Sequence, residues 1–289
     1  MTNGNRVWVT ECPRDAMQGI HEFIPTELKI NYLNALLKVG FDRLDFGSFV
    51  SPKAIPQLAD TKEVLAGLDL SGPTKLLAII ANLRGATEAS SFEHISFLGY
   101  PFSVSETFQR RNTNSGIADS FVTVQQIQEQ AMKSCKELLV YISMAYGNPY
   151  GDDWNSDVVI DWISKLKNTG IKKIALADTV GLANAKEVAY LTSAVIKEFP
   201  DIEVGAHLHC KPGNWHDKVA AAFDAGCRHF DAAIKGLGGC PMAEDDLVGN
   251  LATENLIQYL NQKNVETLIK PVEFNNAMSV SNLVFLPTI

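Results

Sequence analysis

The chain has 289 residues, of which 46% are hydrophobic and 20% charged, so it can bury a sizeable core and is not expected to be disordered. Its 25 Lys and Arg residues against 33 Asp and Glu residues give a formal net charge of −8. This acidic balance argues against a nucleic-acid-binding protein, which needs a basic face for its phosphate contacts.

The five cysteines are odd in number, widely spaced and without a CxxC pair. The sequence therefore predicts no disulfide framework and favours a reducing compartment. No apolar run approaches the roughly 18 residues of a membrane span, and the stretch "MTNGNRVWVT" lacks the apolar segment of a signal peptide. We expect a soluble, cytoplasmic protein that binds neither nucleic acid nor membrane.

Short, almost continuously apolar runs alternate along the chain with segments of helical periodicity. Such runs are typical of strands that are covered on both faces, as in a parallel sheet. The predicted elements, in chain order, are strand 6–11, helix 25–40, strands 43–49, 75–82 and 94–100, helix 119–135, strand 137–145, helix 157–170, strand 173–179, helix 185–199, strand 203–210, helix 215–226 and strand 229–236.

Eight strand-helix units in about 250 residues have the size and alternation of a TIM (β/α)8 barrel. An open, doubly wound sheet is the alternative, but it usually has fewer strands, and no GxGxxG follows the first predicted strand. No break in composition suggests a linker. We therefore predict one catalytic domain, with the barrel over about 6–262 and a short C-terminal extension over 263–289.

Polar side chains gather where the predicted strands end, and in a TIM barrel these ends form the mouth that holds the active site. The main ones are Arg14 and Asp15 after the first strand, Asp45 and Ser48 in the second, Arg110, Arg111 and Asn112 after the fourth, Asp178 in the sixth, His207 and His209 in the seventh, and Cys240 and Asn250 after the eighth.

The two histidines of "AHLHC", His207 and His209, are predicted to face the same side of a strand, about 7 Å apart along it. Alone, the pair could equally be polar residues at a strand mouth, just as Asp15, Asp178 or Asn250 could be turn or cap residues. Gathered at one mouth, two imidazoles, carboxylates and an amide suit Mg²⁺ or Mn²⁺, and Zn²⁺ is a further option. The sequence therefore favours a divalent-cation site.

Five segments in the same order resemble the signature segments of the 3-hydroxy-3-methylglutaryl-CoA lyase family, a group of metal-dependent TIM-barrel enzymes. These segments are "TECPRDAMQG", "DFGSFVSPKAIPQLADT", "ALADTVG", "AHLH" and "GLGGCPMA…GNLATE". The resemblance spans about residues 6–262, and the joint occurrence of "SFVSPK", HxH and "GLGGCP" is what makes it specific.

The resemblance implies roles for individual residues. The implied ligands of the divalent cation are Asp15, His207, His209 and Asn250. Arg14 would stabilise the enolate of the departing acetyl-CoA, Asp178 would take part in catalysis, and Cys240 would belong to a mobile lid over the substrate. Asp45 falls where the family usually has a glutamate that orients metal-bound water.

Three positions depart from the family pattern. Asp45 is one methylene shorter than the usual glutamate, and Cys210 follows the histidine pair where an aspartate is usual. Leu139 stands where these lyases usually carry a substrate-binding arginine in the fifth strand. Arg110 or Arg111 could replace it or bind the phosphates of coenzyme A, or both could be solvated loop residues.

Three functions stay open. The first is a lyase that cleaves 3-hydroxy-3-methylglutaryl-CoA or a close acyl-CoA, with Ser48 and Asn112 among the residues expected near the substrate. The second is a synthase that condenses acetyl-CoA with a 2-oxo acid, which the short C-terminal extension disfavours. The third is an inactive metal-binding barrel. We expect the lyase, with an acyl-CoA as its partner and a homodimer as its assembly.

Overall fold

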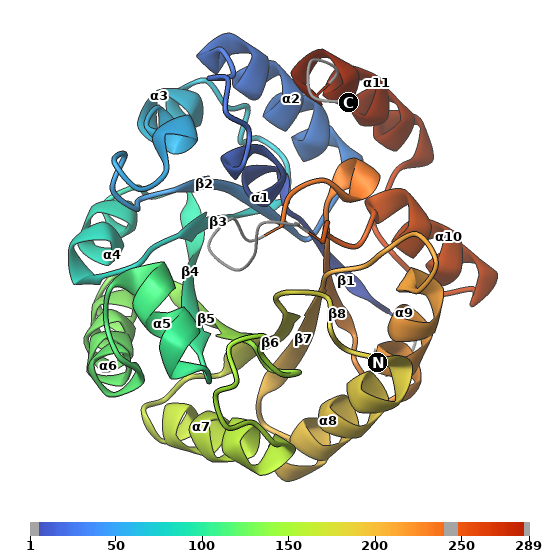
Figure 1. Ribbon diagram of the computed structural model, residues 1–289. Coiled ribbons are helices and arrows are strands. Elements are labelled where there is room, and N and C mark those ends of the chain that lie inside the picture. The colour runs from blue at the N-terminus through green and yellow to red at the C-terminus, as the bar shows by residue number, and fades with distance from the viewer. Residues whose placement is uncertain (1–5, 240–247, 286–289) are drawn as a thin grey trace.

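The computed structural model describes residues 6–239 and 248–285, and within them eight parallel strands close into a barrel with strand order β1 to β8 (Figure 1). The TIM barrel predicted from the sequence is therefore confirmed. The strands are β1 Trp8–Glu11, β2 Arg43–Ser48, β3 Lys75–Ile79, β4 Ile95–Ser103, β5 Glu137–Ser143, β6 Lys173–Asp178, β7 Glu203–Leu208 and β8 His229–Ala232.

Most of the helices form a ring outside the strands, because the outward face of each strand is apolar and must be covered, whereas α1 lies inside this ring at the mouth of the barrel. The helices are α1 Pro13–Gln18, α2 Thr26–Val39, α3 Thr61–Ala66, α4 Leu83–Ser90, α5 Glu106–Thr113, α6 Ile117–Lys133, α7 Ser156–Asn168, α8 Ala185–Glu198, α9 Trp215–Asp224, α10 Thr253–Gln262 and α11 Pro271–Phe285. Across the described ranges, none of these helices is long and apolar enough to cross a membrane.

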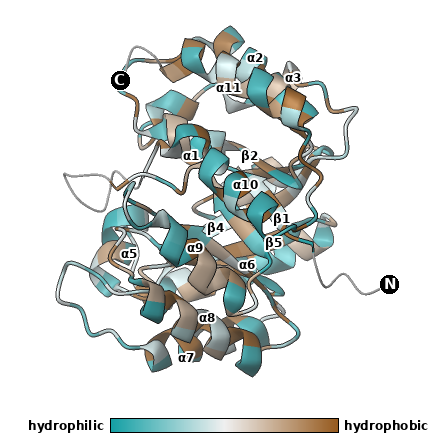
Figure 2. Ribbon diagram, turned by 90° about the vertical axis from the view of Figure 1, so that its right-hand side faces the viewer, coloured by the Kyte–Doolittle hydropathy of each residue, from teal (hydrophilic) through white to brown (hydrophobic). Residues whose placement is uncertain are grey.

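The predicted C-terminal extension is present as α11, which lies beside α2 in both views of the chain (Figures 1 and 2). Tyr32 of α2 and Phe285 of α11 meet edge to face, with ring centroids 5.6 Å apart. Gly40 ends α2 in the left-handed conformation, at φ 96°, and a Cβ there would lie 2.4 Å from the Leu268 carbonyl oxygen. Only glycine fits this close approach, which lets the extension pack against the end of the helix.

Several predicted strand ends were wrong: the strand predicted over 75–82 ends at Ile79, that over 94–100 continues to Ser103, and that over 137–145 ends at Ser143. Two further differences lie at the mouth of the barrel. The strand predicted over 203–210 ends at Leu208, because His209 pairs in antiparallel fashion with Asn250 instead of continuing the parallel sheet. The strand predicted over 229–236 ends at Ala232, and a 3-10 turn, Ile234–Gly236, follows, with Lys235 at φ 66°. The bridge between His209 and Asn250 brings the chain that precedes α10 next to the end of β7.

A separate apolar cluster fills the inside of the barrel. Its members come from alternate positions of β3 to β6, which face the barrel axis: Leu77, Ile79, Phe97, Leu139, Tyr141 and Ala175. Leu139, predicted to replace an arginine, is 3% exposed within this cluster. The cluster fills the barrel below the mouth, and the pocket that holds the predicted site residues opens at the C-terminal ends of the strands.

Candidate active site

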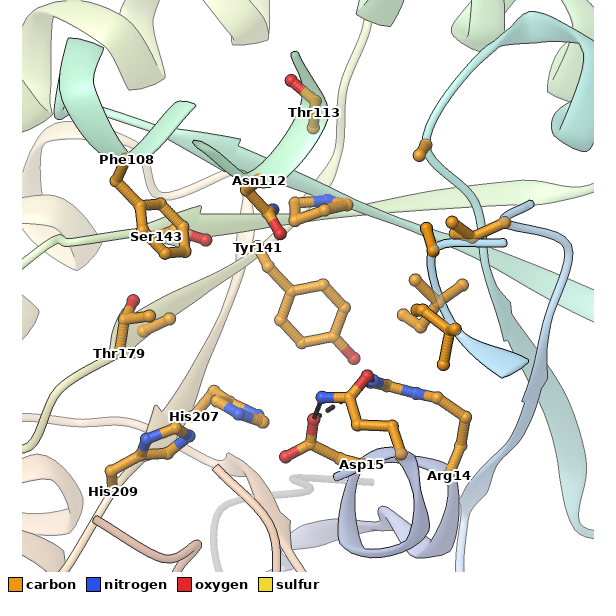
Figure 3. A pocket seen from close by; sticks show the side chains of 18 residues that line it. Arg14, Asp15, Phe108, Asn112, Thr113, Tyr141, Ser143, Thr179, His207 and His209 are labelled. Atoms are coloured by element: carbon orange, nitrogen blue, oxygen red, sulfur yellow. Dashed lines mark hydrogen bonds and ion pairs between the residues drawn. The ribbon is translucent and has the colours of Figure 1, made fainter. Parts of the chain in front are cut away.

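A pocket opens at the C-terminal mouth of the barrel, directly above the apolar cluster (Figure 3). One side is apolar and includes Ile79, Pro101 and Phe108, and the other carries charged side chains from α1 and imidazoles from the end of β7. Such a mixture of an apolar wall and a few convergent polar groups is typical of a small-molecule site.

Arg14 and Asp15 enter the pocket from α1, which begins immediately after β1. Pro13 occupies the first helical position, where its missing N–H costs nothing, so the chain can turn into a helix within two residues of the strand end. Both side chains are buried, at 8% and 6% exposure for the whole residues. The short helix therefore delivers an adjacent cation and anion to the mouth.

The guanidinium of Arg14 is held by three neighbours. Its Nη2 donates to Asp45 Oδ2 at 2.6 Å and its Nε to the same oxygen at 3.0 Å. Its Nη1 donates to Asp15 Oδ1 at 3.1 Å and to Gln18 Oε1 at 2.8 Å. Although burial opposes it, the charges of Asp45 and Asp15 raise the pKa of Arg14 further, so the group stays cationic. Its direction and its charge are both fixed before any ligand binds.

Asp45 lies at the centre of this network and is fully buried. Burial raises the pKa of Asp45 to about 6 against the opposing charge of Arg14, so the carboxylate is ionised at neutral pH. Both of its oxygens accept hydrogen bonds from Arg14. The structure thus places Asp45 in direct contact with Arg14.

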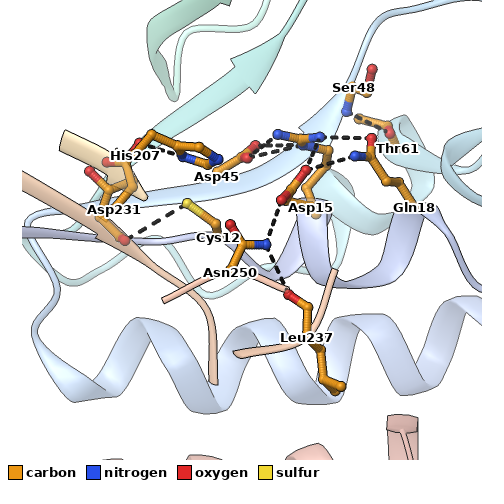
Figure 4. Close-up of polar contacts among 12 residues, drawn as sticks. Cys12, Asp15, Gln18, Asp45, Ser48, Thr61, His207, Asp231, Leu237 and Asn250 are labelled. Carbon is orange, nitrogen blue, oxygen red and sulfur yellow. Dashed lines mark hydrogen bonds and ion pairs between the residues drawn. The ribbon is translucent and has the colours of Figure 1, made fainter. Parts of the chain in front are cut away.

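Asp15, His207 and His209 converge as the sequence predicted: one ligand atom from each lies within 4.8 Å of the other two. Asn250 joins them, because its Nδ2 donates to Asp15 Oδ2 at 2.6 Å and to the Leu237 carbonyl oxygen at 2.9 Å (Figure 4). One carboxylate and two imidazoles at this spacing fit a divalent cation.

The protonation states also favour a cation. Although burial alone would raise it, the charges of Arg14, His207 and His209 hold the pKa of Asp15 below its ordinary value. Burial, together with the neighbouring His207, lowers the pKa of His209 to about 4. At neutral pH the cluster therefore offers an ionised carboxylate and a neutral imidazole, the forms that bind metals.

Asp231 was not predicted from the sequence, yet it orients one of the two histidines. It faces His207 across β7 and β8, and its Oδ2 lies 3.1 Å from His207 Nδ1. Burial by itself lowers the pKa of His207, but the hydrogen bond and charge of Asp231 raise it above its usual value. A carboxylate at Nδ1 places the proton there and leaves Nε2 free to bind a cation. The sequence feature that could have indicated this contact is the position of Asp231 in the last predicted strand, which lies next to the strand of His207.

Gln18 is a second residue that sequence reasoning missed. Its Nε2 donates to Asp15 Oδ1 at 2.7 Å while its Oε1 accepts from Arg14, so one amide bridges the anion and the cation. Gln18 lies one helical turn after Arg14, and this spacing of four residues places the two side chains on the same face of α1.

Asp178 lies away from this cluster. Among the described residues that line the pocket, its neighbour Thr179 is present and Asp178 is not. Its Oδ2 pairs with Lys218 Nζ at 2.6 Å, and its Oδ1 accepts from the Ala183 backbone N–H at 3.1 Å. Burial raises the pKa of Asp178 in spite of the lysine charge.

Of the residues predicted to bind substrate besides Arg14, the structure brings Asn112 to the pocket. Arg110 is exposed and pairs with Glu106 at 2.7 Å, and Arg111 lies over the Tyr150 ring at 4.5 Å. The Ser48 hydroxyl is buried and accepts from the Val50 backbone N–H at 3.2 Å, which shapes the loop after β2.

Cys240, predicted as a lid residue, lies outside the described residues.

Comparisons with known proteins give a consistent result. A family model described as HMGL-like matches residues 6–284. The chain is 33% identical over 261 residues to the hydroxymethylglutaryl-CoA lyase YngG of Bacillus subtilis, covering 89% of this chain and 86% of that one. It is 32% identical over 257 residues to the mitochondrial hydroxymethylglutaryl-CoA lyase of Mus musculus, covering 88% of this chain and 78% of that one.

A solved structure is also similar. It is an HMG-CoA lyase from Acinetobacter baumannii in complex with coenzyme A and 3-methylmalate, with a TM-score of 0.90 and 31% identity, and the match covers 98% of this chain and 92% of that one. The carboxyl transferase domain of Rhizobium etli pyruvate carboxylase, at 16% identity and a TM-score of 0.72, shares the fold alone.

Proposed function

Because this chain belongs to the HMGL-like family, we propose that it is a carbon–carbon lyase that cleaves 3-hydroxy-3-methylglutaryl-CoA, or a close 3-hydroxyacyl-CoA, to acetyl-CoA and acetoacetate or the matching keto product. The observation that carries the proposal is the placement of a fixed guanidinium, Arg14, next to three donors for a divalent cation, Asp15, His207 and His209, at one barrel mouth. The relatives described above are named as lyases, which favours cleavage over the condensing and inactive alternatives.

The cation site is part of this proposal. Asp15, His207 and His209 would hold the ion, with Asn250 beside them. The carboxylate and amide favour Mg²⁺ or Mn²⁺, and the two imidazoles also admit Zn²⁺. When bound, the cation would polarise the 3-hydroxyl group of the substrate and lower its pKa.

Arg14 supplies the second electrostatic element. Cleavage of the bond between C2 and C3 leaves its electron pair on the acetyl-CoA fragment as an enolate, so negative charge develops on the thioester oxygen. A guanidinium that Asp45, Asp15 and Gln18 already orient can stabilise this charge without reorganising during the reaction. Arg14 is therefore the proposed enolate-stabilising residue.

We propose that Asp45 and Asp178 position other groups of the site. Asp45 uses both oxygens on Arg14 and so holds the guanidinium in place. Asp178 is engaged by Lys218 and the Ala183 N–H. The lid role of Cys240 rests on the resemblance and stays a prediction.

The proposed substrate contacts come from residues of α5 at and near the wall of the pocket. Asn112 of α5 faces it and is proposed to contact the acyl-CoA. Arg110 and Arg111 precede it on the exposed side of the same helix, and we propose them as partners for coenzyme A phosphates, which guanidinium groups bind well. The solved relative that holds coenzyme A supports an acyl-CoA ligand.

The assembly and the location of the protein belong to the same proposal. We place it in the cytoplasm as a homodimer, the assembly expected for such barrels. Light scattering after gel filtration checks the assembly: a homodimer has twice the chain mass of 31.6 kDa, and a single-chain mass at working concentration contradicts it.

The activity is tested by incubating the purified protein with 3-hydroxy-3-methylglutaryl-CoA and Mg²⁺ or Mn²⁺. Acetyl-CoA and acetoacetate should appear in equal amounts, and the metal-only blank should give neither. Folded, metal-loaded protein that forms no acetoacetate contradicts this substrate. The same assay with shorter and longer 3-hydroxyacyl-CoA thioesters then separates a wrong substrate from a protein without lyase activity.

A further inference from the structure

Lys218 is a charged side chain buried beneath the candidate cation site. It lies in the first turns of α9, and its side chain is only 1% exposed. Its Nζ reaches three oxygens: Asp178 Oδ2 at 2.6 Å, the His209 carbonyl at 2.9 Å and the Gly181 carbonyl at 3.3 Å. An ammonium group has three protons to donate, so these contacts satisfy it completely.

The three oxygens belong to different parts of the mouth. Asp178 ends β6, Gly181 lies in the turn that follows, and His209 comes directly after β7. One ammonium group thus joins the ends of two neighbouring strands to α9. Neutralising Asp178 does not require the contact between Lys218 and the His209 carbonyl, so this contact indicates a further role for Lys218.

The segment around His209 is held on its other side by the chain that carries Asn250. The Leu251 N–H donates to the Leu208 carbonyl at 2.9 Å, and the Cys210 N–H donates to the Gly249 carbonyl at 2.9 Å. The His209 carbonyl points the opposite way, toward Lys218. The orientation of this one peptide is therefore set from both sides, and it fixes the backbone from which the His209 imidazole extends.

We propose that Lys218 is a positioning residue for cation binding, which holds His209 directly through its carbonyl oxygen. The proposal rests on the cation site of the proposed function. Groups that orient metal ligands from outside typically change metal affinity or activity by about 10- to 100-fold when they are lost.

The variant that isolates this role removes the lysine without leaving a buried charge behind. Lys218→Met alone strands the Asp178 carboxylate in the core, which is strongly destabilising. Lys218→Met combined with Asp178→Asn removes both charges, and the new amide oxygen can still accept from the Ala183 N–H. Mn²⁺ binding is followed by the electron paramagnetic resonance signal of free Mn²⁺, and folding by thermal unfolding.

We expect the folded double variant to bind Mn²⁺ about 10- to 100-fold more weakly than wild type. Its lost activity at low Mn²⁺ should largely return at saturating Mn²⁺, whereas the KM for the acyl-CoA should change little. Asp178→Asn alone keeps the contact between Lys218 and His209, so its Mn²⁺ affinity should stay close to wild type. In this variant the Lys218 amine keeps the His209 and Gly181 carbonyl oxygens and can donate to the new amide oxygen, so it gives a second test where the double variant does not fold.

A second buried lysine provides the matched control. Lys29 of α2 has a side chain that is also 1% exposed, and its Nζ pairs with Asp60 at 2.7 Å and with the Gln57 carbonyl. Lys29→Met combined with Asp60→Asn removes the same kind of pair, and Mn²⁺ affinity should not change.

Three results overturn the proposal: a folded Lys218 double variant with wild-type Mn²⁺ affinity, an equal loss in the Lys29 control, or an equal loss in Asp178→Asn. Wild-type protein that binds no Mn²⁺ contradicts the cation site itself, and this inference with it.

Discussion

At the N-terminal ends of the strands, Glu203 lies between Arg43 and Lys173, whereas at the mouth Arg14 lies between Asp45 and Asp15. The bottom thus places one carboxylate among cations, since Lys173 Nζ is 2.5 Å from Glu203 Oε2. The mouth does the reverse and places one cation among carboxylates.

The histidines follow the same contrast. At the bottom, Glu203 already pairs with Arg43 and Lys173, and its Oε1 lies 3.3 Å from His229 Nδ1. Burial lowers the pKa of His229 to about 4. At the mouth, His207 has its own carboxylate, Asp231, and His209 faces Asp15. Arg14 pairs with two carboxylates there, and a third, Asp231, pairs with His207, so the carboxylates outnumber the arginine.

The comparison shows that similar residue types at the two ends of one barrel serve different purposes. The bottom cluster compensates its own charges and closes the end of the barrel, as expected for the stability face of this fold. The mouth leaves an excess of negative charge and neutral metal-binding donors, an arrangement that suits a bound cation. Matched substitutions at the two ends test this contrast.

The largest expected effect comes from the histidines. His209→Asn removes a proposed ligand, and Mn²⁺ affinity and lyase activity should fall by more than the roughly 100-fold that bounds the effect of groups outside the ligand shell. His229→Asn at the bottom should leave both nearly unchanged, although stability can shift. Calorimetric titration with Mn²⁺ and the acetoacetate assay measure the two quantities. Equal losses in both variants would show that the mouth has no special role.

The arginines give the next largest effect. Arg14→Lys keeps the charge but loses the planar fork that contacts Asp45 and Asp15, so kcat should fall by at least about 100-fold with little change in Mn²⁺ affinity. Arg43→Lys, which alters the corresponding pair with Glu203, is the control and should keep near-normal turnover. If Arg14→Lys also kept near-normal turnover, Arg14 would be a structural residue.

The sequence predicted the barrel well because each covered strand is an almost continuous apolar run, which is easy to recognise. The strand ends were less predictable. Nothing in "AHLHC" indicates that His209 leaves the parallel sheet, because its partner Asn250 lies about 40 residues later in the chain. Such a contact depends on tertiary structure and leaves no local periodicity.

The convergence of Arg14, Asp15, His207 and His209 could be predicted because each comes at the end of a strand and such ends meet at one mouth. Closeness to a strand end did not determine side-chain direction, so Ser48, Arg110 and Arg111 point to other partners. Lys218 could not be found by this reasoning, because a lysine on a helix normally faces solvent.

The smallest predicted effect concerns the stability that one glutamate contributes at each end of the barrel, Glu11 at the mouth and Glu203 at the bottom. Glu11, the last residue of β1, is fully buried, accepts from Thr253 Oγ1 at 2.6 Å and from the Ile234 N–H at 2.8 Å, and has no cation among these partners. Burial raises the pKa of Glu11 to about 8. For Glu203, burial has the same tendency, but His229, Arg43 and Lys173 outweigh it and lower the pKa.

These opposite shifts predict opposite pH dependences. The folded protein keeps a proton on Glu11 that the unfolded chain releases near pH 4.5, so the stability contributed by neutral Glu11 is lost progressively as the pH rises from about 4.5 and is gone once it has passed about 8. Between pH 7 and 9 the free energy of unfolding should fall by about 1 kcal/mol more in wild type than in Glu11→Gln. Glu203 stabilises above its unfolded pKa, so Glu203→Gln should be destabilising at neutral pH, and the difference from wild type should narrow only in acid. Urea unfolding at pH 5, 7 and 9 measures all three proteins, and parallel wild-type and Glu11→Gln curves between pH 7 and 9 would contradict a protonated Glu11.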